Sequence, residues 1–436
     1  MIFLINLLIV CIALFPKINI ISIGTSSAGI RVEDFLLALI CALMFIFSKY
    51  NKLNKKVDKN FLQVRKLFYL YFVLSIFSTV YGIAKGYVSP IVSTLFVIRK
   101  LEYFFMLYIG YYYGMESTKI NMKFLDLTVI FHFLMCILQQ VGLIGSFNRG
   151  EMLTTLTQGR VSSTFNGAYE LSAFLLLLLP YYLKKIIEPG KGKVKSIIYI
   201  CLITFCILLS MSRTSLIIEL VIIGLMLYKY GVLKNRKLVQ NVFIIFLALI
   251  LPLFSIIVPK IDFSRFENLN LRKTIYIFQY TWKYKNFNKY ILTGSWYGNS
   301  IYTLNQFDAM GYDGSLYQRV SHWMQLIDGW ATSPLIGVGV SVSGNSADGN
   351  YIKILVETGI IGLVVWCILL KKIYIILRKE KNWIFYSYIS VLLGSLFIDL
   401  FDSSKVIMTL WFLIGIYIRR SFDKNEENCK KYCNNK

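Results

Sequence analysis

The chain has 436 residues, of which 56% are hydrophobic and only 16% are charged, and its formal net charge is +24. Soluble domains average about 45–50% apolar and roughly 25% charged residues, so this composition excludes an ordinary soluble protein. A strongly basic chain can indicate nucleic-acid binding, but here most basic residues lie in the breaks between apolar segments. The composition predicts a polytopic membrane protein that binds no nucleic acid.

Apolar runs of about the length that crosses a bilayer core of roughly 30 Å recur along the chain. The first run lacks a basic segment before it, so we interpret it as a retained first helix and not as a signal peptide. The sequence predicts an all-α integral membrane protein with about twelve transmembrane helices. The expected spans lie near residues 2–20, 33–48, 67–84, 95–115, 124–145, 168–187, 196–211, 214–230, 239–257, 351–370, 383–400 and 406–419.

The basic residues predict the orientation of these spans. Of the 47 Lys and Arg residues, 29 lie in alternate breaks or in the tail, at residues 49–66, 116–123, 184–195, 229–237, 371–381 and 419–436. Lys and Arg in short loops mark the cytoplasmic side of a membrane protein. We therefore expect both termini and the basic tail 420–436 in the cytoplasm, and the protein in the cytoplasmic (inner) membrane.

One long segment interrupts the series of spans. Residues 258–350 separate nine helices in 1–257 from three in 351–419, and we expect them to form a large extracytoplasmic loop containing short helices. Long loops in compact folds are usually functional. The stretch "LRKTIYIFQYTWKYKNFNKY" is typical of a helix at the lipid headgroups. The loop aromatics can stack on sugars or anchor the loop at the interface; they are Trp282, Trp296, Tyr297, Tyr302, Tyr317, Trp323 and Trp330.

Few basic residues fall on the predicted outer face, and three of them stand at the mouths of spans. Arg160 precedes a Leu-rich span, Arg213 occupies the tight turn "SMSRTSL", and Arg319 lies near the end of the large loop. A guanidinium matches phosphate oxygens two at a time, so these residues are candidates for binding a lipid-linked pyrophosphate. Snorkelling to lipid phosphates is the alternative for each arginine taken alone.

Three blocks of the sequence resemble the O-antigen polymerase and O-antigen ligase family of bacterial surface-polysaccharide assembly. They are "RVSSTFNGAYELSAFLLLLLP", "SMSRTSL", and "SPLIGVGV" followed by "DGNYIKILVETGIIGL". The resemblance runs from about residue 159 to 370. It implies a metal-independent, inverting glycosyltransferase without a cofactor, which moves glycan from undecaprenyl pyrophosphate to a hydroxyl of another lipid-linked repeat unit. A flippase and a chain-length regulator are the implied partners besides the bilayer.

The resemblance has one departure that bears on the catalytic base. The histidine of the ligases falls on Asp348, nine residues before Glu357, and this favours a polymerase of O-antigen or capsule repeats. Asp348 is the first candidate for the base and Glu357 the second, while a role for Asp348 as a loop cap stays open. His322 follows Arg319 by three residues, and it is a third candidate that can equally be structural.

Two alternatives to the polymerase remain open at this point. A ligase would move finished glycan to another acceptor by the same chemistry, and the sequence barely separates it from a polymerase. A flippase or exporter of the lipid-linked oligosaccharide would be a non-enzyme, with charges along the middle of its spans. The identity of the sugar, its linkage and the repeat length do not follow from the sequence.

Overall fold

We describe the protein from a computed structural model. The structure describes all residues except 18, 23–28, 51–57, 117–122, 149–150, 154, 157–158, 189–191, 232–270, 343–347, 380–381 and 435–436. The predicted span at 239–257 therefore lies outside the described residues.

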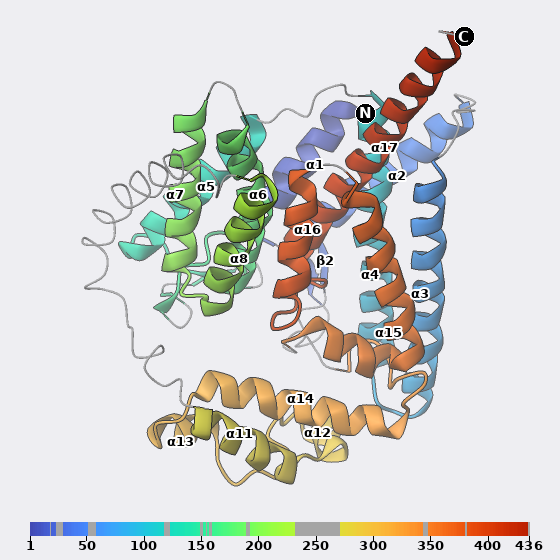
Figure 1. The fold of residues 1–436 in the computed structure, drawn as a ribbon. Helices are drawn as coiled ribbons and strands as arrows, with labels where there is room; N and C mark the ends of the chain where they lie inside the picture. The colour runs from blue at the N-terminus through green and yellow to red at the C-terminus, as the bar shows by residue number, and fades with distance from the viewer. Residues whose placement is uncertain are drawn as a thin grey trace.

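Helices dominate the described part of the chain (Figure 1). They are α1 (Ile2–Leu14), α2 (Val32–Tyr50), α3 (Lys59–Ala84), α4 (Pro90–Glu116), α5 (Lys123–Gln140), α6 (Ala168–Ile187), α7 (Lys193–Leu209), α8 (Arg213–Lys229), α11 (Leu271–Tyr284), α12 (Phe287–Thr293), α13 (Leu304–Ala309), α14 (Gly314–Thr332), α15 (Asn350–Leu377), α16 (Trp383–Gly394) and α17 (Ser404–Asn434). Two short antiparallel hairpins join them, β1 (Asn19–Ser22) with β2 (Gly29–Arg31) and β3 (Phe147–Asn148) with β4 (Glu151–Met152).

The predicted all-α membrane fold agrees with this architecture. Every predicted span outside 239–257 overlaps a helix. Three of the helices, α3, α5 and α15, are long and apolar enough to cross a membrane by length and composition, and α1 and α16 are shorter apolar helices. The total of twelve spans stays a prediction.

The large loop lies at one end of the bundle. Figure 1 shows both chain termini at the opposite end from α11, α12, α13 and α14, and α14 lies across the ends of the bundle helices. We call the end near α14 the loop end. The termini and the loop thus lie at opposite ends of the molecule, and the membrane side that each end faces stays a prediction from the charge pattern.

Close packing holds the bundle together. Every residue from Leu171 to Leu183 in α6 is buried, as expected of a helix that is apolar on all sides. Helices α4 and α17 approach most closely at two glycines. A Cβ atom on Gly110 would lie 2.2 Å from the carbonyl oxygen of Phe412, and one on Gly415 would lie 2.3 Å from that of Leu107. Small residues permit such close backbone contact between membrane helices.

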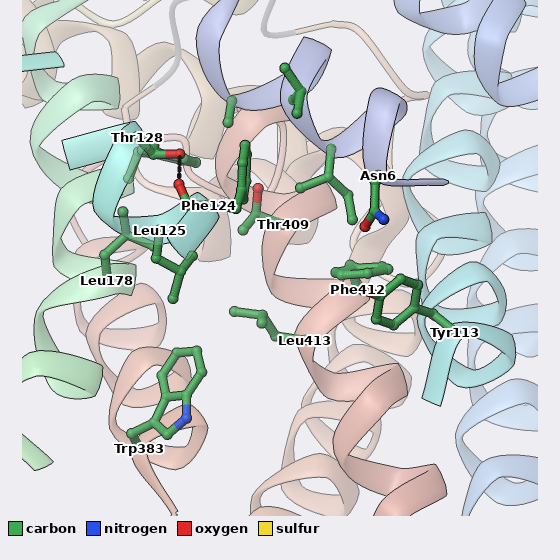
Figure 2. Close-up of a pocket in the computed structure, with 14 residues that line it drawn as sticks. Asn6, Tyr113, Phe124, Leu125, Thr128, Leu178, Trp383, Thr409, Phe412 and Leu413 are labelled. Carbon is green, nitrogen blue, oxygen red and sulfur yellow. Dashed lines mark hydrogen bonds between the residues drawn. The ribbon is translucent and has the colours of Figure 1, made fainter. Parts of the chain in front are cut away.

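A cavity of about 200 Å³ lies inside the bundle, between α1, α4, α5, α6, α16 and α17 (Figure 2). Its walls are mainly apolar, and Asn6, Thr128 and Thr409 are among the few polar side chains on them. Thr128 donates its hydroxyl proton to the carbonyl oxygen of Phe124, 2.9 Å away. The lining carries no charged side chain, so this cavity is unsuited to binding a pyrophosphate.

Helix α15 bends at Gly359, and the segment 334–339 packs against the bend. Gly359 has φ 68° and ψ −174°, so two helical segments meet there. A Cβ atom on Gly359 would lie 2.2 Å from the carbonyl oxygen of Leu335. The backbone of 334–339 runs along this bend, with Val338 N donating to Val356 O at 2.9 Å and Ile360 N donating to Pro334 O at 2.9 Å. The glycines of "GVGV" and "ETGIIG" thus serve close packing.

Candidate functional site

Arg160 stands at the start of a buried loop that leads into α6. Gln139 of α5 holds this loop, because its side-chain oxygen accepts from the backbone N–H of Ser162 at 3.0 Å and of Ser163 at 2.7 Å. Ser163 has φ 50°, an uncommon conformation for a residue with a side chain. The Arg160 guanidinium donates to the carbonyl oxygen of Met211 at 3.4 Å. The first predicted arginine therefore lies beside the turn that carries the second.

Arg213 is the first residue of α8, two residues after Met211. Its Nη2 lies 2.9 Å from Oδ2 of Asp313, and their side chains are 21% and 12% exposed. Asp313 is the N-cap of α14, and its Oδ1 accepts from Leu316 N at 3.1 Å. Capping carboxylates stabilise helix N-termini. This ion pair fastens the start of α14 to the turn between α7 and α8.

Arg319 lies on α14 and pairs with Asp348, the residue predicted as catalytic base. Their side chains are 30% and 23% exposed. The Asp348 carbonyl oxygen accepts from the indole N–H of Trp323. Gly349 follows with φ 91°, in contact with Trp323 and with the carbonyl oxygen of Leu396. The positive φ favours glycine at this position.

Helix α14 carries Arg319, and its N-cap Asp313 is the partner of Arg213. Arg319 lies six residues after Asp313, a separation of roughly 9 Å along the helix axis at 1.5 Å per residue. The structure thus brings Arg160, Arg213 and Arg319 to the loop end, and we call these three residues the arginine row. Arg213 and Arg319 both contact carboxylates at partly exposed positions, where an anionic ligand can exchange with the carboxylate.

Glu357, the second predicted base, lies in a buried contact away from the arginine row. It is 1% exposed. Its Oε2 lies 3.0 Å from Nζ of Lys100, and its Oε1 accepts from Ser341 N at 3.0 Å. Both carboxylate oxygens are therefore engaged by groups that hold 334–341 against α4 and α15. This geometry favours a structural function for Glu357 and leaves Asp348 as the better candidate base.

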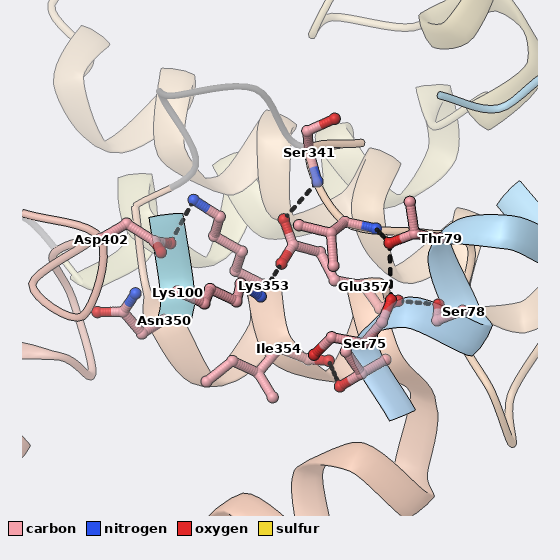
Figure 3. Close-up of polar contacts among 12 residues, drawn as sticks. Ser75, Ser78, Thr79, Lys100, Ser341, Asn350, Lys353, Ile354, Glu357 and Asp402 are labelled. Carbon is pink, nitrogen blue, oxygen red and sulfur yellow. Dashed lines mark hydrogen bonds and ion pairs between the residues drawn. The ribbon is translucent and has the colours of Figure 1, made fainter. Parts of the chain in front are cut away.

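A buried ionic cluster that the sequence did not reveal surrounds the start of α15 (Figure 3). Nζ of Lys353 lies 2.8 Å from Oδ2 of Asp399 and 2.6 Å from Oδ2 of Asp402. Asn350 donates to Asp399, and its side-chain oxygen accepts from Phe401 N at 2.9 Å. One feature of the sequence could have indicated this cluster: the two acidic residues in "FIDLFDSSK" lie between two apolar spans. Ionisable groups at membrane depth require partners.

We name Lys100, Glu357, Lys353, Asp399 and Asp402 the buried ionic cluster. It ties the first turn of α15 to α4 and to the loop between α16 and α17. Asp348 precedes that first turn by two residues, so the cluster fixes the backbone next to the candidate base. Its members act on the site by positioning it.

His322 lies inside the loop, on the side of α14 that packs against α12. It is 1% exposed, and its ring stacks on Trp296 with centroids 4.5 Å apart and an interplanar angle of 14°. Nε2 lies 3.4 Å from the hydroxyl of Tyr290, which donates to Val342 O at 3.0 Å. Burial raises the pKa of Tyr290 to about 12, so that hydroxyl keeps its proton. These contacts favour the structural interpretation of His322.

Lys405 is a further residue that sequence reasoning missed. It is 2% exposed at the start of α17 and donates to the carbonyl oxygen of Thr164 at 3.1 Å and to its hydroxyl at 2.9 Å. Its Nζ also lies 4.2 Å from the ring centroid of Phe165. Lys405 therefore holds the loop that begins at Arg160. Within the described ranges, no cluster of three or more His, Cys, Asp or Glu side chains is placed to hold a metal ion.

Comparison with known proteins agrees with the resemblance seen in the sequence. Residues 198–367 match a family model described as O-antigen ligase. The match includes Arg213, Arg319 and Asp348, and it begins after Arg160. No curated protein matches the chain. Over the matched residues the chain is therefore similar to the O-antigen ligase family that its sequence motifs resemble.

Proposed function

Because residues 198–367 match an O-antigen ligase-like family, we propose that this protein is a polysaccharide polymerase of the cytoplasmic membrane. It transfers a growing glycan from undecaprenyl pyrophosphate to a hydroxyl of another lipid-linked repeat unit. The arginine row carries this proposal. Its guanidinium groups lie at the end of the bundle that the charge pattern assigns to the outer side.

The reaction needs stabilisation of the leaving group. The acceptor oxygen forms a bond to the anomeric carbon while the bond from that carbon to the pyrophosphate breaks, and the electron pair stays on the departing diphosphate. Cations fixed beside that oxygen stabilise the transition state more than the ground state. Arg213 at the start of α8 and Arg319 on α14 supply two such cations, and Arg160 supplies a third beside Met211.

The pairing of Arg319 with Asp348 suggests how the base becomes available. In the described structure the Asp348 carboxylate accepts from Arg319. When the donor diphosphate takes the guanidinium, the Asp348 carboxylate loses its partner and is free to accept a hydrogen bond from the attacking hydroxyl. It then accepts the proton of the attacking hydroxyl. Direct attack of this kind inverts the anomeric centre.

A ligase is the second candidate, because the matching family model is described as O-antigen ligase. The chemistry at the arginine row would be the same, and the acceptor alone would differ. Asp348 in place of the histidine of the ligases supports the polymerase. In cells, a strain without the gene separates the two: loss of a polymerase leaves single repeats, and loss of a ligase leaves full-length unattached glycan.

Transport of the lipid-linked sugar is the remaining alternative, and two buried charge pairs bear on it. Lys17 and Glu170 form a buried pair at 2.8 Å, and Lys100 and Glu357 form another at 3.0 Å. Each of these charges has a partner within the protein, as structural charges in membranes do. A polymerase would still depend on a separate flippase for its donor and could work with a chain-length regulator.

Purified protein tests the proposal. A synthetic undecaprenyl-pyrophosphate-linked repeat unit is incubated with the protein in nanodiscs, without nucleotide sugar and with a chelator present. We expect products of two, three and more repeats, and release of undecaprenyl pyrophosphate in equal number to the new bonds. Absence of elongation, while a reporter shows movement of the lipid between leaflets of protein-containing vesicles, would replace the enzyme by a transporter.

A further inference from the structure

A groove of about 350 Å³ lies on α11, away from the arginine row. Four phenol rings and two polar side chains carry the argument; they are Tyr276, Tyr280, Tyr284, Tyr302, Gln279 and Lys283. Ligand sites in proteins typically enclose about 300–1,000 Å³. The groove is thus large enough for a small ligand or for part of a chain.

The spacing of these residues follows the helix. Tyr276, Tyr280 and Tyr284 are four residues apart and share one face of α11. Gln279 and Lys283 form a parallel row beside them, and both are exposed. The groove therefore offers aromatic faces along one side and hydrogen-bonding groups along the other.

Hydrogen bonds fix the floor of the groove before any ligand binds. The hydroxyl of Tyr280 accepts from Ile301 N at 3.2 Å and from Ser300 Oγ at 3.1 Å. The carbonyl oxygen of Tyr302 accepts from the hydroxyl of Tyr317 at 3.0 Å. Tyr276, in contrast, is 41% exposed. A preorganised floor with one exposed ring lowers the entropy cost of binding.

A series of aromatic contacts joins the groove to the arginine row. The rings of Tyr312 and Tyr276 have centroids 5.3 Å apart, and those of Tyr276 and Tyr280 are 6.0 Å apart. Tyr280 continues to Tyr302 at 5.7 Å. Tyr312 directly precedes Asp313, the partner of Arg213. Phenol rings in contact with one another therefore extend from Tyr312, beside Asp313, to the groove.

We propose that this groove is a binding subsite for the glycan chain of the substrate. The C–H groups on one face of a pyranose ring carry partial positive charge and pack on the negative face of an aromatic ring. Gln279, Lys283 and the phenol hydroxyls hydrogen-bond to the sugar hydroxyls. The subsite retains the chain near the arginine row between successive transfers. This inference rests on the proposed function.

A lipid surface is the competing occupant, and it would use a different face of α11. Leu271, Ile275, Phe278 and Trp282 form an exposed apolar stripe, with exposures of 76%, 49%, 38% and 55%. At 100° per residue the stripe lies within roughly 60° of arc, and the centre of the tyrosine row lies about 170° away. Figure 1 shows α11 on the far side of α14 from the bundle helices. Both observations favour a glycan for the groove.

Binding of released glycan tests the proposal with the full-length protein in nanodiscs. The probe is polysaccharide released by mild acid from cells that express the protein, fractionated to two to four repeats, with dextran as a control polymer. We expect the variant Tyr276→Ala/Tyr302→Ala to weaken binding at least tenfold. Gln279→Ala/Lys283→Ala alters exposed side chains and should weaken it about fivefold to a hundredfold if each loses one hydrogen bond.

Matched variants on the stripe separate glycan from lipid. Ile275→Ser/Trp282→Ser should bind the glycan like the wild type. The subsite is refuted if wild-type protein fails to bind the released glycan, if both groove variants bind it normally, or if only the stripe variant loses it.

Chain length supplies a readout that distinguishes this proposal from the proposed function. Groove variants should make the first bond at the wild-type rate but give shorter chains. A wild-type protein that binds glycan without elongating it would refute the polymerase but not the subsite. Groove variants that give the wild-type distribution of chain lengths would refute the subsite but not the polymerase.

Discussion

The arginine row and the buried ionic cluster both gather charges near the loop end, but they differ in exposure. The side chains of Arg213 and Arg319 are 21% and 30% exposed. Those of Lys353 and Glu357 are 3% and 1% exposed. A charge that reaches solvent can exchange its partner for a ligand, whereas a buried charge depends on its partner for stability. The comparison assigns binding to the row and positioning to the cluster.

The largest effect should follow from breaking the buried ionic cluster. Lys353→Met removes the cation that faces Asp399 and Asp402, and unpaired buried charges destabilise a protein by about 3–5 kcal/mol. We expect the variant to lose the folded form in detergent, as measured by fluorescence-detected size exclusion and thermal unfolding.

The matched control is Lys184→Met, which breaks an exposed pair with Glu188 at 3.5 Å. Surface pairs contribute about 0–1 kcal/mol, so this variant should keep the wild-type unfolding temperature within a few degrees. Equal effects of the two substitutions would show that burial of the pair does not decide its contribution to stability.

Arg213→Lys sharpens the assignment of binding to the row. The substitution keeps the charge near Asp313 but loses the planar fork that holds two phosphate oxygens. Loss of one oxyanion-stabilising donor lowers kcat by about 10²–10³. We expect elongation to fall in that range while the yield of folded protein holds. Full activity of the variant would count against a guanidinium clamp.

Asp348→Asn separates the base from the clamp. The amide still accepts a hydrogen bond from Arg319 but takes no proton from the acceptor, and loss of a general base lowers rates by about 10²–10⁴. Turnover should fall while binding of the donor lipid is unchanged, as measured by single-turnover kinetics and equilibrium binding. Unchanged turnover would move the role of base to Glu357 or His322.

His322→Phe should have the smallest effect on catalysis. The ring still stacks on Trp296, and the contact with Tyr290 is lost. We expect elongation within about threefold of the wild type, with a loss of roughly 1 kcal/mol of stability for the missing hydrogen bond. A loss of activity of a hundredfold without loss of folded protein would show that His322 takes part in the chemistry.

The helices were predictable from the sequence because an apolar run of bilayer length specifies a helix from local information alone. The same information located Arg160, Arg213 and Arg319 at the mouths of predicted spans. Long-range partners were not predictable. Asp313 lies 100 residues from Arg213, and Lys353 lies 46 residues from Asp399. The pairing of Asp348 with Arg319 likewise depends on how α14 crosses the bundle.

The roles of Glu357 and His322 show the limit of motif reasoning. Both residues lie at the positions that the resemblance and the spacing single out, yet their side chains face packed interior. Gly359 illustrates the cause. Its positive φ bends α15 two residues after Glu357, whose carboxylate pairs with Lys100. A glycine in an apolar span does not by itself tell whether the helix continues or bends.

Binding of undecaprenyl pyrophosphate to protein in nanodiscs tests the central claim most directly. The double variant Arg213→Gln/Arg319→Gln is compared with Lys184→Gln/Lys195→Gln, which removes two positive charges from the last turn of α6 and the first turn of α7. The account predicts a dissociation constant at least tenfold higher for the arginine variant and an unchanged one for the lysine variant. Equal affinity of the wild type and the arginine variant would contradict it.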